Sequence, residues 1–261
     1  MICFHSMNLV SIEQINFYIK NGYLILNNFV NKNEINEYIN SLEKLHDGTI
    51  DPGNQKNDLG RHEGKSTTGK ENITQIMFPS DFIPSLNTSS FFTKSKIVAR
   101  NLLGNDMERD MDMVVEKFPL TNVATPWHQD SAYWPKGMKD TRSLSCWLAL
   151  DDATVDNGCM WYVPGSHKED TRKHNWAGND EKKSYALITE CDESEGVACP
   201  IPAGNMIVHD GRTLHYSRGN STAGRRRALI TNYRSEEMIK WERSIGYNHR
   251  NEKIDDNNVI T

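Results

Sequence analysis

The feature that most constrains the fold is a series of short segments rich in β-branched and aromatic residues after residue 110. Six of them are expected to be strands: residues 112–118, 143–150, 159–163, 205–208, 214–217 and 227–233. Turn-forming pairs such as Pro164-Gly165, Ala203-Gly204 and Gly219-Asn220 stand between several of these segments. Many short strands separated by turns predict a mainly β fold, a β-sandwich or jelly roll.

The first 110 residues have a different texture, which predicts helices and one strand. Ser11 precedes a partial apolar face and is suited to cap a helix that Gly22 ends. Helical spacing of apolar residues returns over residues 33–45 and 91–103. Residues 23–30 are instead rich in β-forming residues.

Length does not require a second domain, because barrels and sandwiches of about this size commonly fold as one unit. We therefore expect a single domain over residues 1–261, with a helical part at about 1–110 and a jelly-roll core at about 111–235. Three polar stretches are expected to be irregular: residues 47–70, residues 166–195, which we place over one mouth of the barrel, and residues 248–261, which we expect to fray.

Charge and composition exclude several classes of partner. The net charge is −5 and the one dense basic run, residues 225–227, is short, so no nucleic-acid partner is expected. No apolar run approaches the roughly 20 residues of a membrane span, and the first ten residues lack the pattern of a secretory signal. The 5 cysteines show no C-x-x-C spacing, which indicates neither a disulfide framework nor a zinc knuckle. We expect a cytoplasmic protein.

A possible metal site begins at His128 and Asp130. In an extended segment, side chains two residues apart point to the same side, so an imidazole and a carboxylate can reach one ion. A histidine from a distant strand would complete the two-histidine, one-carboxylate set of non-haem iron oxygenases. Taken alone, H-x-D is a weak signal, and a hydrogen-bonded pair without metal is the alternative.

Two histidines, His209 and His215, compete for the third ligand position. A 2-oxoglutarate site needs a cation that holds the distal carboxylate, and arginine does so in a two-pronged, planar way. Arg226 lies 11 residues after His215 across a turn, whereas the same step from His209 reaches Asn220, which carries no charge. The spacing therefore favours His215 and leaves His209 as a supporting or strand-end histidine. Ser217 shares a face with His215 and could donate to the same carboxylate.

Six blocks of sequence, in this order, resemble the phytanoyl-CoA dioxygenase family: S-I-E-Q-I-N-F-Y-I-K-N-G-Y-L, W-H-Q-D-S-A-Y-W-P, S-C-W-L-A-L-D-D, D-N-G-C-M-W-Y-V-P-G-S-H-K, H-D-G-R-T-L-H-Y-S-R-G-N-S and R-R-A-L-I-T-N-Y-R. The resemblance is weakest over residues 47–110 and after Ser235. It implies a double-stranded β-helix that uses Fe(II), 2-oxoglutarate and O2.

Carried over position by position, the resemblance implies that His128, Asp130 and His215 bind iron. Arg226, Ser217 and Trp147 would then hold the cosubstrate. A carboxylate at position 130 implies hydroxylation of a small-molecule C–H bond, with release of succinate and CO2, rather than halogenation. Tyr133 and Trp134 follow closely enough to line the substrate cavity, and exposed aromatic residues beside a turn are the alternative reading.

Other interpretations stay open at this point. A cupin-like jelly roll that only binds metal, or a cupin-like hydrolase, would share the strands but has no need of Arg226. Arg225 and Arg227 are expected to be solvated, since they point away from Arg226. Lys117 and Arg142 are possible contacts for an anionic substrate. The substrate and the oligomeric state cannot be read from the sequence.

Overall fold

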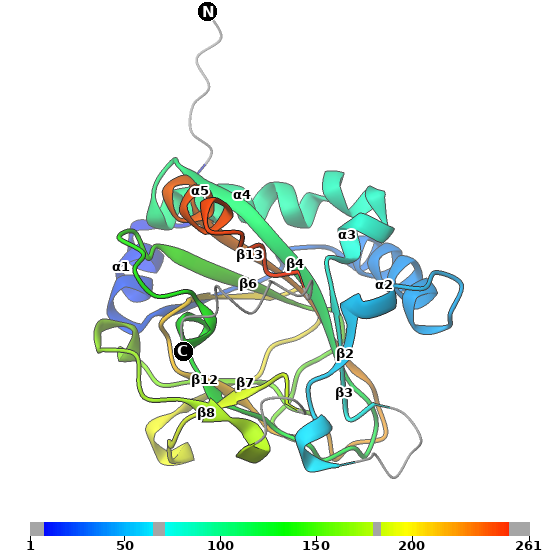
Figure 1. Cartoon of the computed structure of the whole chain (residues 1–261). Coiled ribbons are helices and arrows are strands. Elements are labelled where there is room, and N and C mark those ends of the chain that lie inside the picture. Colours follow the sequence, from blue (N-terminus) through cyan, green and yellow to red (C-terminus); the bar gives the residue numbers. More distant parts are fainter. Residues whose placement is uncertain (1–7, 65–70, 180–183, 251–261) are drawn as a thin grey trace, which may run out of the picture.

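The computed structural model describes residues 8–64, 71–179 and 184–250. Its strands form two facing antiparallel sheets (Figure 1). The larger sheet has the order β1 (Tyr23–Leu26), β11 (Met206–Asp210), β6 (Ser143–Ala149), β13 (Arg226–Ser235), β4 (Met107–Lys117), β3 (Ile73–Met77) and β2 (Lys56–Asp58). The smaller sheet has the order β10 (Val197–Cys199), β7 (Met160–Tyr162), β12 (His215–Ser217) and β5 (Thr125–His128). A separate ribbon pairs β8 (Asn175–Trp176) with β9 (Leu187–Ile188).

Helices cover the outer face of the larger sheet. They are α1 (Ile12–Asn21), α2 (Lys32–His46), α3 (Pro79–Phe82), α4 (Ser90–Leu103) and α5 (Glu236–Ser244). In Figure 1, α4 and α5 lie over β4 and β13, on the side away from the smaller sheet. One apolar cluster fills the space between helices and sheet, with Phe91 and Leu148 fully buried in it. A second cluster, which includes Tyr162 and Ile207, lies between the two sheets.

This arrangement confirms the jelly-roll expectation, and all six expected strands are present with somewhat different ends. The prediction for the N-terminal third was wrong in one respect, because β2 and β3 were not expected and both join the larger sheet. They are short strands of 3 and 5 residues, too short for alternation to be visible, and β2, at the edge of the sheet, is polar as edges commonly are. The sheet therefore extends on both sides of the boundary placed near residue 110.

The expectations for the polar stretches also need correction. Helix α5 was not predicted, and residues 248–250, expected to fray, instead contact the body of the protein. Residues 251–261 lie outside the described part of the chain, as do residues 65–70 and 180–183 of the two expected loops. Within the described ranges, no helix combines the length and apolar character needed to cross a membrane.

The end of α1 shows how the N-terminal helix is joined to the sheets. Ser11 and Gln14 form a capping box at its start, as the sequence predicted for Ser11. At its end Gly22 has φ +81°, and a Cβ built there would lie 2.4 Å from His167 Nδ1 and 2.5 Å from Thr213 Oγ1. Gly22 is therefore required by backbone conformation and by close packing together.

Gly22→Ala is expected to destabilise the protein by about 2 kcal/mol or more, since a positive φ costs about 1–2 kcal/mol and overpacking adds about 1–3 kcal/mol. Gly48 provides the matched control. It has φ +85° and nothing lies within 4 Å of a Cβ built on it, so Gly48→Ala should show the backbone cost alone. Urea unfolding measures both, and equal losses would contradict the packing argument.

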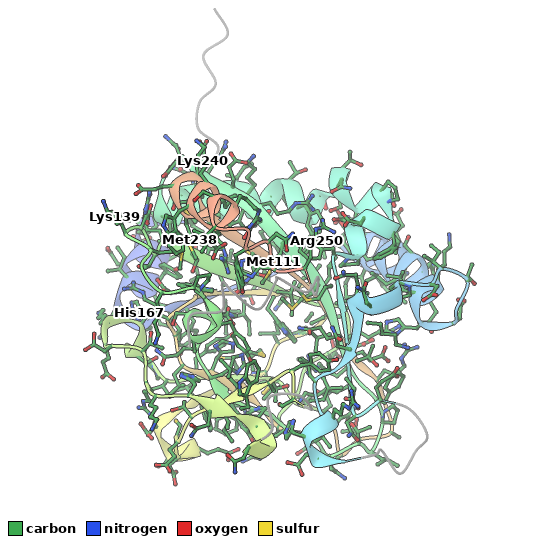
Figure 2. All side chains as sticks on the ribbon, viewed as in Figure 1. Met111, Lys139, His167, Met238, Lys240 and Arg250 are labelled. Atoms are coloured by element: carbon green, nitrogen blue, oxygen red, sulfur yellow. The ribbon has the colours of Figure 1, made fainter. Side chains whose placement is uncertain are left out.

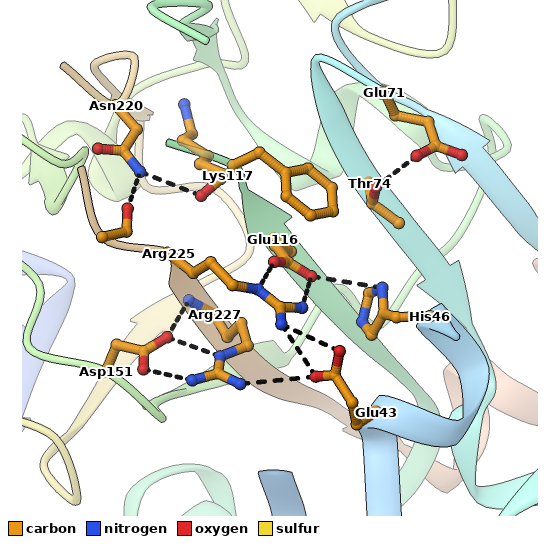
Figure 3. Close-up of polar contacts among 12 residues, drawn as sticks. Glu43, His46, Glu71, Thr74, Glu116, Lys117, Asp151, Asn220, Arg225 and Arg227 are labelled. Atoms are coloured by element: carbon orange, nitrogen blue, oxygen red, sulfur yellow. Dashed lines mark hydrogen bonds and ion pairs between the residues drawn. The ribbon is translucent and has the colours of Figure 1, made fainter. Parts of the chain in front are cut away.

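The two arginines that flank Arg226 are only partly solvated and are held in ion pairs, which corrects the expectation that they are free in solvent. Arg225 pairs with buried Glu116 and, at 3.0 Å, with Glu43 of α2. Arg227 pairs with Asp151 at 2.7 Å. Figure 3 shows these contacts as one network between the start of β13 and α2. Side chains that point away from the cavity here lie against the covering helix and are only partly exposed.

His46 completes that network and makes it sensitive to acid. Its Nδ1 lies 3.3 Å from Glu116 Oε2 (Figure 3). Burial lowers the pKa of His46 below its ordinary value, although Glu116 opposes the shift. The His46 imidazole therefore binds a proton more tightly in the unfolded chain than in the folded one. Protonation then favours the unfolded chain, so the free energy of unfolding falls as pH drops below about 6.5.

We expect the free energy of unfolding to fall between pH 7.5 and pH 5.5, and to fall less steeply in His46→Gln. Each unit of pKa difference corresponds to about 1.4 kcal/mol. Urea titrations at both pH values measure the slopes. The comparison at pH 7.5, where His46 is neutral in both states, serves as the control for the substitution itself. Identical slopes in the two proteins would show that His46 does not contribute.

Candidate active site

Three metal-type donors meet between the sheets. His128 ends β5, Asp130 begins the short 3-10 helix η4 (Asp130–Tyr133), and His215 begins β12, where it is the Cα partner of His128. Asp130 Oδ1 lies 3.8 Å from His128 Nε2 and 3.6 Å from His215 Nε2, and one donor atom from each residue falls within 4.8 Å of the others. Gln129 between them is extended, which places His128 and Asp130 on one side as predicted.

The hydrogen bonds and the surroundings set these donors in the protonation states that a metal needs. The Nδ1 of His128 donates to Pro126 O at 2.7 Å and that of His215 to Thr213 O at 2.8 Å, so each Nε2 presents its lone pair. Burial lowers the pKa of both imidazoles. Burial alone would raise the pKa of Asp130, but the facing histidines outweigh it and lower that pKa. Two neutral imidazoles and a carboxylate result.

The other oxygen of Asp130 is held by side chains from the larger sheet. Ser145 Oγ of β6 donates to Oδ2 at 2.8 Å, and His209 Nε2 of β11 lies 3.5 Å from the same oxygen. The Tyr162 hydroxyl lies 3.1 Å from His209 Nδ1. Burial raises the pKa of Tyr162 well above its ordinary value, so the hydroxyl keeps its proton and can donate to Nδ1. His209 then carries its hydrogen on Nε2, toward Asp130.

Arg226, Trp147 and Ser217 line the same cavity as the two histidines. The Arg226 side chain is 1% exposed, and its Nε and Nη1 have no hydrogen-bond partner among the described residues. Its guanidinium carbon lies 5.4 Å from the centre of the Trp147 ring. Burial lowers the pKa of Arg226 to about 10, which leaves the group charged at neutral pH. An unpaired buried cation of this kind is suited to a carboxylate ligand.

The cavity has a volume of about 360 Å³ and opens beyond the metal-type donors. Both Tyr133 and Trp134 line the cavity, as the sequence suggested. They are therefore not simply exposed aromatic residues beside a turn. The Tyr133 hydroxyl accepts from Leu187 N at 2.8 Å, and its backbone carbonyl accepts from the Tyr247 hydroxyl at 3.1 Å. Tyr133 therefore joins the expected insertion and the C-terminal segment to the cavity wall. Met111 of β4 and Arg250 also line the cavity (Figure 2).

Two residues that the sequence offered as contacts for an anion do not serve that purpose. Lys117 is fully buried, and its Nζ donates to the carbonyl oxygens of Val123, Ser217 and Arg218. Arg142 pairs with Asp106 and Asp140. Lys117 therefore fixes the backbone at the end of β12, beside its strand partner Arg226.

Sequence reasoning missed Ser145 and Asn232, which lie opposite each other on β6 and β13 and both line the cavity. The alternation of β6 would have placed Ser145 on the same face as Trp147. Nothing local in the sequence indicates that this face meets Asp130.

A double-stranded β-helix with a two-histidine, one-carboxylate cluster between its sheets defines the class of non-haem iron, 2-oxoglutarate-dependent oxygenases. The family model described as phytanoyl-CoA dioxygenase (PhyH) matches residues 18–228. The chain therefore belongs to the phytanoyl-CoA dioxygenase family of dioxygenases.

Individual relatives agree with this placement. The chain is 26% identical over 248 residues to a probable phytanoyl-CoA dioxygenase of Caenorhabditis elegans, covering 90% of this chain and 78% of that protein. It is 24% identical over 259 residues to the ectoine dioxygenase of Bordetella bronchiseptica, covering 94% and 82%. Among solved structures, EvdO2 of Micromonospora carbonacea var. aurantiaca, complexed with 2-oxoglutarate, superposes with a TM-score of 0.73 at 27% identity, covering 87% of this chain and 92% of that one.

Proposed function

We propose that this protein hydroxylates a C–H bond of a small-molecule metabolite, using Fe(II), 2-oxoglutarate and O2 and releasing succinate and CO2. Iron is held by His128, Asp130 and His215. Arg226 and Ser217 hold the distal carboxylate of 2-oxoglutarate, with Trp147 against its chain. The observation that carries the proposal is the Arg226 guanidinium, which is buried without an anion in the same cavity as the three metal-type donors.

The donor set supports iron rather than a structural metal. Two neutral imidazoles and one carboxylate leave room on the ion for exchangeable ligands, whereas structural zinc sites are closed by four protein ligands. When bound, Fe(II) and 2-oxoglutarate supply the oxidising chemistry, in which one O2 oxidises both the keto acid and the substrate C–H.

The chain's own groups position and shield that chemistry. His128 and His215 are kept neutral by burial and oriented by backbone carbonyls, so both nitrogens are ready to bind. Ser145 donates to Asp130 Oδ2, with His209 Nε2 3.5 Å from the same oxygen, and Oδ1 is left to face the histidines. Tyr133, tied to Leu187 and Tyr247, closes the wall beside His128 and limits the access of water. A misplacement of the reacting atom by about 1 Å can cost on the order of 100-fold in rate.

Anaerobic titration with Fe(II) and 2-oxoglutarate tests the proposal. The wild-type protein is expected to develop the weak visible charge-transfer band of the iron–keto-acid chelate. His215→Ala is expected to lose the band, because the third ligand is gone. Iron bound without any band in the wild type would overturn the use of 2-oxoglutarate and favour a cupin-like metal protein.

Partner and location remain predictions from the sequence. A small molecule is the proposed partner, and neither nucleic acid nor membrane is expected. The proposed cytoplasmic location rests on the cysteine content alone. Fractionation of cells that express the tagged protein would test it.

A further inference from the structure

A row of polar side chains leads from Asp130 along the wall of the cavity. Ser145 on β6 is the Cα partner of Asn232 on β13, and Ser143 on the same face of β6 is the partner of Arg234. All four side chains line the cavity. The row begins at the proposed metal ligand and runs away from Arg226, so it lies at the substrate end.

The hydrogen bonds determine which way the Asn232 amide faces. A carboxylate only accepts, so the hydroxyl hydrogen of Ser145 is used in its 2.8 Å bond to Asp130 Oδ2. Ser145 Oγ can then only accept from Asn232, whose Nδ2 lies 2.5 Å away. The amide nitrogen is therefore directed toward Ser145, and the amide oxygen Oδ1 is directed away from it.

That oxygen needs a donor which the described protein does not supply. Asn232 is 6% exposed, and no group in the described ranges donates to its Oδ1. Ser143 is 4% exposed, and its hydroxyl has no partner there either. A buried polar atom left without a partner costs about 1–3 kcal/mol, and both atoms belong to side chains that line the cavity. They are suited to a ligand that carries hydrogen-bonding groups.

The charged residue of the row does not call for an anionic ligand. Arg234 Nη1 lies 2.7 Å from Glu242 Oε1, and its Nε lies 3.4 Å from Asp110 Oδ2. Both carboxylates are buried, so they compensate its charge inside the protein. Beside the row, Trp134 lies under Arg234 and Met111 lies opposite Asn232. Arg250, which also lines the cavity, is paired with Asp81 at 2.6 Å.

We propose that Asn232 Oδ1 accepts a hydrogen bond from a substrate hydroxyl or amino group, and that the substrate class is small alcohols and amines. This inference rests on the proposed function. Asn232 is two hydrogen bonds from Asp130, so the recognised group lies close to the C–H bond that is oxidised. Asn232 is thus a specificity-determining residue, and a long hydrocarbon chain does not satisfy it.

The test measures succinate formation with pairs of compounds that differ only in one donor group. The panel contains glycerol and 1,3-propanediol, ethanolamine and ethylamine, and amino acids with their desamino forms. In the wild type, loss of the recognised group is expected to lower kcat/KM by about 1,000-fold or more, because a site built to bond a hydroxyl rejects analogues that lack it. In Asn232→Leu, which keeps the side-chain shape, the ratio is expected to approach one.

Ser145→Ala tests how the Asn232 amide is oriented. It removes the acceptor that fixes the amide as well as the donor to Asp130 Oδ2, so the discrimination ratio is expected to fall and iron is expected to bind more weakly. The chelate band, recorded in each variant, reports the proposed function independently. A ratio that is equal in the wild type and Asn232→Leu would overturn the assignment while leaving a normal band intact.

If no compound of the panel is turned over, crystals with Fe(II) and 2-oxoglutarate are soaked anaerobically in 1,2-propanediol. A hydroxyl is expected within hydrogen-bond distance of Asn232 Oδ1 in the wild type and not in Asn232→Leu. A diol bound elsewhere in the cavity, or absent from Asn232 at saturating concentration, would overturn the proposal.

Discussion

Asp130→Ala is expected to abolish the iron–keto-acid band and substrate-dependent succinate formation. The Nε2 atoms of His128 and His215 converge on Oδ1 of Asp130, which is the one carboxylate residue of this cluster in the described part of the chain. Residues that merely support a metal ligand are commonly worth about 10–100-fold in affinity or activity, so loss of the ligand itself should exceed about 100-fold. Iron content after dialysis and the band intensity measure the effect.

Rescue by formate distinguishes a missing ligand from a misfolded protein. The Asp130→Ala side chain leaves room for a small carboxylate beside His128 and His215, so formate is expected to restore part of the band. Asp130→Asn, which keeps the shape without the charge, should remain inactive and should not respond to formate. Full retention of activity in Asp130→Ala would remove Asp130 from the ligand set.

Arg226→Met is expected to weaken 2-oxoglutarate binding strongly while leaving iron binding intact. Removing one partner of a buried charge pair costs about 2–5 kcal/mol, which corresponds to an increase of roughly 30- to 4,000-fold in the 2-oxoglutarate requirement. The same substitution should stabilise the ligand-free protein or leave it unchanged. Arg226 is buried with two unpartnered guanidinium nitrogens among the described residues, and replacing buried charge with apolar atoms is commonly neutral or stabilising by about 1–4 kcal/mol.

Arg227→Met is the matched control one position along β13. Arg227 pairs with Asp151 and Glu43, so its loss should lower stability and leave the 2-oxoglutarate requirement unchanged (Figure 3). Thermal unfolding with and without 2-oxoglutarate, together with titration of the chelate band, measures both properties. An unchanged 2-oxoglutarate requirement in Arg226→Met would show that another cation holds the cosubstrate.

The amino-acid sequence by itself determined the properties that depend on neighbours along the chain. Alternation of side chains over two residues put His128 and Asp130 on one side, and it put Ser217 on the side of His215. The step from His215 to Arg226 is short enough for a single turn between adjacent segments to be inferred. Apolar spacing and the cap at Ser11 likewise predicted α1, α2 and α4.

Only the tertiary structure decided which faces meet. Side-chain alternation predicts only that Ser145 and Asn232 each point to one side of a strand. The order of strands in the larger sheet makes these two residues partners, although they are 87 residues apart in the chain. The same order brings His209 to Asp130 and places Arg225 in an ion pair with Glu43. Contacts of this kind depend on sheet order and register, because strand pairing joins segments that no local pattern relates.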